Sequence, residues 1–400
     1  MYLLLEWICW ISLIVVFYTY VGYGILAAII VRIKGRSVKP MPFQSDADLP
    51  EVALVICAYN EEDIIEQKII NSREIDYPAN KLRIIVVSDG STDHTHQKAQ
   101  QLLGENALFE PRRGGKVAAM NRVVPLISES LIVFCDANTF LNANSVRALV
   151  RYFQDPLVGA VAGEKKIEMA ASGKAVTSGE GFYWKYESLL KSIDAGIYSV
   201  VGAAGELFSI RRNLYQPTEG DVIIEDFVLS LRVCLQGYKV AYAPDAYAIE
   251  SGSAEMKEEQ KRKVRICAGG FQAIGRLKKL LNPFRNPWLT FSYLSHRVFR
   301  WTVAPLGLLL LLISNICLVV MRAGWIYDWL LIGQALFYLV AVLGWVLSNK
   351  NLKIKALSVP YYFLFMNVSA YLGFFKFLNG KQSVLWEKSR RLDSGISRQI

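Results

Sequence analysis

Three short groups of carboxylate and amide side chains stand out in the first third of the chain. They read Tyr59-Asn60-Glu61-Glu62, Ser88-Asp89-Gly90-Ser91-Thr92-Asp93 and Asp136-Ala137-Asn138. Any one of them alone is consistent with an ordinary turn that carries a capping aspartate. Together they favour a polar binding site, because carboxylate and amide oxygens accept hydrogen bonds from a ligand and bind hard divalent cations.

Each group follows a run of residues that is typical of a buried strand. The runs 52–58, 82–87 and 131–135 are continuously apolar, as in parallel strands covered on both faces, and helices are expected at 61–73 and from about Thr95. This alternation predicts an α/β fold with a Rossmann-like, doubly wound sheet. Ligands bind beyond the carboxyl ends of such strands, so the three polar groups should meet at one edge of the sheet.

The apolar residues of the 400-residue chain concentrate at its two ends. Hydrophobic residues make up 53% of the chain, and the formal net charge is +10. The distribution predicts membrane-spanning segments around a soluble core, with basic flanks on the cytoplasmic side. Anionic donors or membrane lipids could account for part of the positive charge. We expect no nucleic-acid partner, because no recognisable binding module accompanies the charge.

The N-terminal run 3–31 is long enough to cross the hydrocarbon core and contains one charged residue, Glu6. A cleaved signal peptide would have a basic start and a shorter apolar stretch. Here the basic residues follow the run, at Arg32, Lys34, Arg36 and Lys39. We therefore expect residues 1–32 to form an uncleaved transmembrane helix whose C-terminal end is cytoplasmic.

The C-terminal part returns to apolar sequence after a basic and aromatic segment at 276–300, which suits a membrane surface. Two or three spans are expected in the region 301–378, and the last apolar run contains Pro360, Asn367 and Gly373. Three spans would place the basic tail 379–400 outside, against its charge. We therefore expect one late segment not to cross, and the last run could be broken or re-entrant.

The motifs of the middle region resemble those of family 2 of the membrane-bound inverting GT-A glycosyltransferases, which includes the cellulose, chitin, hyaluronan and poly-N-acetylglucosamine synthases. The matching segments are CAYNEE (57–62), VSDGSTD (87–93), GGKVAAMN (114–121), FCDANT (134–139), VGAAGELFSIRR (201–212) and IIEDFVLSLRV (223–233). The resemblance implies a cytoplasmic GT-A domain over residues 50–270. It also implies a UDP-sugar donor.

The same resemblance implies a donor site and a metal site. Ala58, Tyr59, Glu61, Asp89, Lys116 and Asp136 would bind the donor, with Lys116 in a glycine-rich turn that allows close approach to the nucleotide. Asp136 and Asn138 match the family's Asp-x-Asp position, which would hold Mg²⁺ or Mn²⁺ against the donor diphosphate. Asn138 replaces an aspartate that the family often has, so Asp136 should carry more of the metal binding.

Asp226 matches the position of the family's catalytic base, which takes the proton of the acceptor hydroxyl, with Glu225 beside it. A simpler interpretation is that both acids stabilise the first turn of a helix. Arg265 matches the arginine of the Gln-x-x-Arg-Trp motif of processive members and could meet the diphosphate. Arg262 and Ile266 replace the glutamine and the tryptophan, which puts processivity in doubt.

The acceptor site is less clearly marked. The segment 179–190, with Tyr183 and Trp184, could stack on sugar rings, but ordinary helix packing explains it equally well. By analogy with the family, the loop 202–205, with Ala203 and Ala204, would lie under the sugars, and Arg262 would face the acceptor. The tail residues Trp386, Arg390 and Arg391 loosely resemble a gating motif of polymerising members.

The expected function is transfer of a sugar, with inversion, from a UDP-sugar to a saccharide or lipid-linked acceptor. We expect a multi-pass protein of the cell (inner) membrane that acts in polysaccharide or glycolipid synthesis. Transfer to a polyprenyl or other lipid phosphate is an alternative with the same donor site. A transporter with a regulatory nucleotide domain is a remote alternative, because the late apolar runs have almost no ionisable residues in mid-span.

Overall fold

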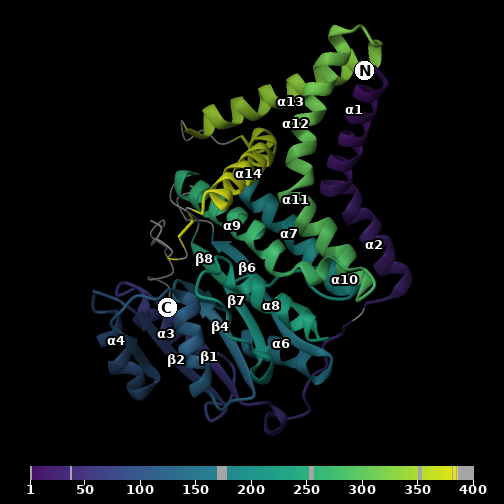
Figure 1. Cartoon of the computed structure of the whole chain (residues 1–400). Helices are drawn as coiled ribbons and strands as arrows, with labels where there is room; N and C mark the ends of the chain where they lie inside the picture. The colour runs from purple at the N-terminus through teal and green to yellow at the C-terminus, as the bar shows by residue number, and fades with distance from the viewer. Residues whose placement is uncertain are drawn as a thin grey trace.

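The fold is described from a computed structural model of the chain (Figure 1). The described residues are 2–36, 38–168, 178–251, 256–349, 354–380, 382, 383 and 385. An α/β domain contains the strands, and long helices extend from one side of it (Figure 1).

An eight-stranded mixed sheet forms the centre of the α/β domain. Its strands are β1 (Val52–Ala58), β2 (Leu82–Asp89), β3 (Ala107–Glu110), β4 (Leu131–Asp136), β5 (Thr139–Leu141), β6 (Val158–Glu168), β7 (Leu207–Arg211) and β8 (Lys239–Ser251). Their order is β3-β2-β1-β4-β7-β6-β8-β5. The first four neighbours pair in parallel as expected, whereas β7 is antiparallel to both β4 and β6, and β5 is antiparallel to β8.

Both faces of the sheet are covered, which explains the continuous apolar runs. Alternate residues of β1 enter two different cores: Val55 packs on one face, and Leu54 and Ile56 pack on the other. The covering helices include α3 (Ile65–Arg73), α4 (Thr95–Leu103), α5 (Lys116–Val123), α6 (Ser145–Val150) and α8 (Glu225–Leu235). The predicted helix 61–73 begins four residues later than expected, because Glu61 to Ile64 form a turn whose backbone bonds to Asp93 and Thr95.

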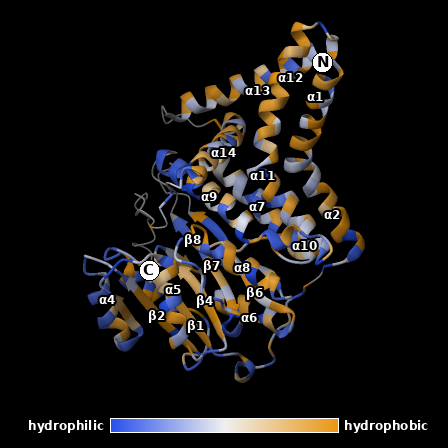
Figure 2. Cartoon of the chain, in the orientation of Figure 1, coloured by the Kyte–Doolittle hydropathy of each residue, from blue (hydrophilic) through white to orange (hydrophobic). Residues whose placement is uncertain are grey.

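Three helices among the described residues are long and apolar enough to cross a membrane. The first is an almost continuous helix made of α1 (Tyr2–Phe17), a π-helical segment (Tyr18–Gly22) and α2 (Tyr23–Lys34). The others are α12 (Val303–Val320) and α13 (Trp325–Asn349). They project from the α/β domain, and Figure 2 shows that they are largely hydrophobic.

The last helix, α14 (Lys355–Leu378), contains Pro360 and is not among these three. It packs against α7 (Ser178–Ile197) and α9 (Met256–Arg276), and at Gly373 it approaches the backbone of α9 so closely that a Cβ would lie 2.6 Å from Cys267. The segment 276–300 forms short helical turns, ending in a π-helical segment (Tyr293–Val298) and α11 (Phe299–Trp301). The number of crossings stays a prediction.

A buried polar contact fastens the N-terminal helix to the α/β domain. The hydroxyl of Tyr23 on α2 donates to the carboxylate of Asp194 on α7, which also bonds to His296. All three side chains are fully buried. Since buried polar groups are costly unless they are paired, this contact orients α2 on α7 specifically.

Candidate active site

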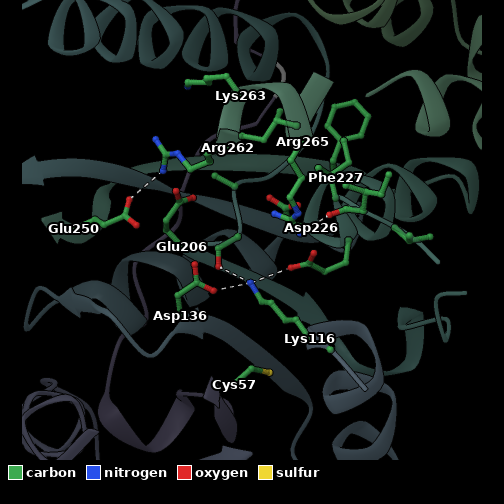
Figure 3. A pocket seen from close by; sticks show the side chains of 18 of the residues that line it. Cys57, Lys116, Asp136, Glu206, Asp226, Phe227, Glu250, Arg262, Lys263 and Arg265 are labelled. Carbon is green, nitrogen blue, oxygen red and sulfur yellow. Dashed lines mark hydrogen bonds and ion pairs between the residues drawn. The ribbon is translucent and has the colours of Figure 1, made fainter. Parts of the chain in front are cut away.

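A cavity of about 1030 Å³ opens at the carboxyl ends of β1 and β4 and extends among the helices that follow the α/β domain. Tyr59, Glu61, Lys116, Asp136 and Asn138 line what we term its sheet-edge half. Residues of α7, α9, α11 and α14 line what we term its helical half. Figure 3 shows the side chains between the two halves.

The first strand end forms one wall of the sheet-edge half. Asn60 adopts a left-handed backbone conformation, with φ of 54°, and its side-chain oxygen accepts a hydrogen bond from the backbone of Thr92 at 2.8 Å. This ties the ends of β1 and β2 together. The guanidinium of Arg113 lies 3.6 Å from the centroid of the Tyr59 ring, so a cation–π contact holds the ring at the cavity wall.

Asp89 and Ala58, both predicted to bind the donor, do not line the cavity. Asp89 is 1% exposed, and its carboxylate accepts hydrogen bonds from the backbone of Gly114 at 3.0 Å and of Gly115 at 2.6 Å, and pairs with Arg122. Ala58 is a buried strand residue. Asp89 is therefore placed to hold the glycine-rich turn that begins α5, rather than to contact a ligand directly.

Lys116, the first residue of α5, lies at the centre of an acidic cluster. Its Nζ is 2.7 Å from the carboxylate of Asp136, 3.0 Å from that of Glu225 and 3.4 Å from the carbonyl oxygen of Gly205 (Figure 3). These partners come from three separate parts of the chain. The fold thus brings the motif that contains Asp136 next to the motif that contains Glu225, which lies almost ninety residues later.

The pKa values of the four ionisable groups in this cluster shift in different directions. Burial lowers the pKa of Lys116, but the surrounding carboxylates, Asp136 first, outweigh that effect and raise it well above its ordinary value. Burial raises the pKa of Asp136. Burial also opposes ionisation of Glu225, but Lys116 and Arg265 lower its pKa overall. Burial, followed by the charge of Glu225, raises the pKa of Asp226 to about 7, despite the opposing effect of Lys116.

Asp226 lies in the first turn of α8, and the loop 202–205 positions this turn. Gly202 has φ of 101°, a conformation that favours glycine, and a Cβ there would collide with the ring of Phe227. The backbone of Ala203 donates to the hydroxyl of Ser230 on α8 at 2.9 Å. The predicted loop therefore lies against the helix that carries Asp226, and Ala203 and Ala204 both line the cavity.

The cavity wall from α9 contains Arg262, Arg265 and Ile266. Arg265 donates to the carbonyl oxygen of Ile223 at 2.9 Å, two residues before the acidic pair of α8. Tyr183 and Trp184 of α7 also line the cavity, and Lys263 lies 4.8 and 5.1 Å from the centroids of their rings. The structure thus places the predicted catalytic and acceptor residues around one space.

Arg262 belongs to a buried ionic network that the sequence did not reveal. It pairs with Glu259 at 3.0 Å and with Glu250 at 3.6 Å, and Lys165 joins Glu250 to Glu206. Glu206 follows the loop 202–205 directly, within the segment 201–212 that resembles the family, whereas Lys165 on β6 belongs to no recognisable motif. The network links the α9 wall to the carboxylates near Asp226.

Trp301 is a second feature that sequence reasoning missed. Its ring packs on α9 so closely that a Cβ at Gly270 would lie 2.6 Å from it, and it meets the Phe227 ring edge-on with centroids 5.4 Å apart. The basic and aromatic character of 276–300 was interpreted as a membrane-surface signal. Trp301, just beyond that segment, instead supports α8 and lines the cavity. The tail motif Trp386, Arg390 and Arg391 lies outside the described residues.

The sheet-edge half offers oxygen ligands that suit a divalent cation. Asp136 and the amide-bearing Asn138 leave the same strand end and line the cavity together. Within the described ranges, no group of three or more His, Cys, Asp or Glu side chains could hold a metal ion. One carboxylate and one amide oxygen are a donor set to which Mg²⁺ can bind when substrate phosphates supply further ligands.

Comparison with known proteins identifies the family and the fold of the chain. Residues 50–269 match the family described as Glycosyltransferase like family 2. The poly-beta-1,6-N-acetyl-D-glucosamine synthase of Staphylococcus aureus (strain MSSA476) is 28% identical over 245 residues, which cover 57% of each chain. The beta-monoglucosyldiacylglycerol synthase of Synechocystis sp. is 25% identical over 244 residues, 57% of this chain and 49% of the relative. This chain therefore spans about half the length of these relatives.

Among solved structures, the mannosyltransferase PcManGT from Pyrobaculum calidifontis, in complex with GDP-Man and Mn²⁺, has the same fold. The TM-score is 0.72 at 20% identity, and the match covers 94% of this chain and 99% of that one. The predicted class, a GT-A type α/β domain flanked by apolar helices, is confirmed. Because the family match extends over more than half of the chain, the chain belongs to the glycosyltransferase like family 2.

Proposed function

We propose that the chain transfers a sugar, with inversion, from a UDP-sugar to a hydroxyl group of a saccharide or lipid-linked acceptor. One observation carries this proposal: Lys116, Asp136, Glu225 and Asp226 come together in one cavity at the strand ends. The lysine can bind the diphosphate of a donor, one carboxylate can bind a divalent cation, and another can accept a proton, all within one site.

The sheet-edge half would bind the donor. Tyr59 and Glu61 line the wall where the nucleoside would lie, and Lys116 would approach the diphosphate. Asp136 and Asn138 would hold Mg²⁺ or Mn²⁺, which would neutralise the charge of the departing diphosphate. PcManGT binds Mn²⁺ and a nucleotide sugar in its structure, which supports a divalent cation here without choosing between the two metals.

Asp226 would act as the base. Inversion needs one group that accepts the proton of the acceptor hydroxyl on the side opposite the leaving diphosphate. The raised pKa of Asp226, about 7, suits this role, because a base works best when its pKa is near the working pH. Arg265 would help to balance the negative charge beside Glu225.

The reaction would take place at the cytoplasmic surface of the cell membrane. The apolar helices and the membrane-lipid product named for the Synechocystis relative support a membrane setting and a product of the polysaccharide or glycolipid class. Ile266 stands where processive members have tryptophan, so we do not assign a polymer product.

The test is release of UDP by detergent-purified full-length protein. UDP-glucose, UDP-N-acetylglucosamine, UDP-galactose and UDP-glucuronate would be screened with Mg²⁺ or Mn²⁺, beside Asp226→Asn. Metal-dependent turnover of one donor that is lost in the variant is the expected result. If folded protein binds no UDP at all, the donor assignment is wrong. UDP binding without turnover would point to a missing acceptor or partner subunit.

A further inference from the structure

The helical half of the cavity contains a buried lysine that the proposed reaction does not use. Lys191 on α7 is 2% exposed and lines the cavity. Its ammonium lies 6.0 Å from the centroid of the Tyr242 ring, at the outer limit of a cation–π contact. Within the part of the chain that the structure describes, this ammonium has no hydrogen-bonding or ion-pair partner.

The carboxylates nearest to Lys191 along α7 already have other partners. Glu187, one turn earlier, pairs with Arg297 at 2.6 Å and with Arg300 at 3.0 Å. Burial opposes ionisation of Glu187, but these cations, Arg297 first, lower its pKa well below the ordinary value. Asp194, three residues later, accepts from Tyr23 and bonds to His296. Neither acid neutralises Lys191.

A second cation lies in the same wall. Arg297 lines the cavity, and its position is fixed because Nε donates to the carbonyl oxygen of Val201 at 2.9 Å and Nη2 pairs with Glu187. Three carboxylates surround these cations, because Glu164 on β6 accepts from Ser188 and Tyr242 beside the two acids of α7. None of the three, all of them among the described residues, forms an ion pair with Lys191. A buried ammonium without a counter-ion is costly, so the arrangement favours an anionic ligand.

The surroundings indicate what carries the anion. Trp301 and Met366 line the same cavity and provide an apolar part of its wall. Trp301 ends α11, two residues before α12 begins, and Met366 lies on α14, which packs against α13. This apolar wall therefore adjoins the apolar helices, as expected for a ligand with a charged head and a hydrocarbon chain.

We propose that Lys191 and Arg297 form a binding subsite for a phosphate group attached to the acceptor, whose apolar chain lies along Trp301 and Met366. Ammonium and guanidinium groups are the usual protein ligands of phosphate, through charge-assisted hydrogen bonds. The proposal rests on the proposed function, because it assumes that the acceptor enters the cavity that contains Asp226. It narrows the acceptor to a saccharide linked to a lipid phosphate, whose sugar hydroxyl would reach Asp226.

The test measures binding of dodecyl phosphate to the full chain in a non-ionic detergent by titration calorimetry. UDP and Mg²⁺ are present throughout, so that the donor site is filled. Inorganic phosphate and dodecanol are titrated in parallel. Lys191→Met should weaken dodecyl phosphate binding at least about tenfold, because a charged hydrogen bond is lost. Lys191→Arg should restore it to within about threefold. Lys185→Met, an exposed lysine on the same helix, should change nothing.

Equal binding by wild type and Lys191→Met, or binding of dodecanol as tight as that of dodecyl phosphate, would overturn the proposal. If inorganic phosphate binds as tightly as dodecyl phosphate and depends on Lys191 in the same way, the subsite takes free phosphate, and the lipid-linked acceptor is ruled out. UDP binding, measured separately on each variant, checks the fold. It also separates failure of this subsite from failure of the donor assignment.

Discussion

The two halves of the cavity are built in different ways. The sheet-edge half comes from strand ends, where polar groups follow apolar runs within a few residues, and each group is visible in the sequence as a local motif. The helical half comes from α7, α9, α11 and α14, whose contacts join residues far apart in the chain, such as Phe227 and Trp301. Local sequence motifs therefore predict the polar residues at the sheet edge but predict little of the opposite wall.

The two halves of the cavity should differ in function, and this difference can be tested. Changes in the sheet-edge half should alter donor and metal binding, whereas changes at the seam between the halves should alter turnover and leave UDP binding intact. The residues at the seam are Asp226 and the loop 202–205. Experiments that measure UDP affinity and turnover separately can support or break this division.

The largest effect is expected at the seam. Asp226→Asn removes the proposed base with little change in shape, so turnover should fall roughly 10²–10⁴-fold while UDP affinity is unchanged. Both can be measured by UDP release and calorimetry on the same preparation. Asp221→Asn, at an acidic side chain that is 68% exposed, is the matched control and should behave as wild type. Full activity of Asp226→Asn would exclude the assigned base.

A smaller loss is expected from Asp136→Asn in the sheet-edge half. It removes the charge that faces Lys116 and the proposed metal, so metal affinity should fall by more than the roughly 10–100-fold that loss of an outer-shell partner costs. Mn²⁺ binding in the presence of UDP, followed by electron paramagnetic resonance, reports this without turnover. Asp76→Asn, an exposed aspartate, is the control. Unchanged Mn²⁺ affinity would move the metal site away from Asp136.

Gly202→Ala should reduce turnover roughly 10–100-fold, because a shift of about 1 Å in a positioned group can cost that much. The new methyl group collides with Phe227, and the left-handed backbone at 202 disfavours alanine, so the melting temperature should also fall. Gly275→Ala, in α9, meets no atom within 4 Å and should be neutral or slightly stabilising. Wild-type turnover in Gly202→Ala would show that the loop does not position α8.

The last prediction concerns pH and needs no substitution. Since the pKa of Asp226 is raised to about 7, the base is protonated below that pH and cannot accept a proton. Turnover should therefore drop about tenfold for each pH unit below 7 and level off above it. Rates measured from pH 5 to 9, with UDP affinity as the parallel readout, test this. A profile that is flat through pH 7 would contradict the assignment of Asp226.

The sequence was sufficient for the α/β class, for the family and for the position of most side chains that line the sheet-edge half, because covered parallel strands require continuous apolar runs and end in polar turns. The roles of these side chains stay predictions. It did not show that Asp89 is buried behind the glycine-rich turn, since strand-end position does not tell which way a carboxylate points. The short strand β3 and the antiparallel β7 were missed for a related reason: four or five residues carry too little pattern.

The helical half could not be predicted, because the contacts of its side chains depend on which helices pack together. Lys191 lies in an unremarkable stretch of α7, and Glu187 acquires three cationic or imidazole partners only through the segment 293–300. The same segment was interpreted from its basic and aromatic composition alone. Composition indicated a membrane setting but not the inward contacts of its side chains.

The N-terminal helix has a consequence for where the reaction can occur. Its 33 residues form a rod of about 50 Å at 1.5 Å per residue, whereas a bilayer's hydrocarbon core is about 30 Å thick. Because the lower part of this rod is clamped to α7 through Tyr23 and Asp194, the excess length cannot act as a loose tether. We therefore expect this helix, placed across a bilayer, to fix the distance between the cavity and the membrane surface, and so to limit which acceptor groups can enter the cavity.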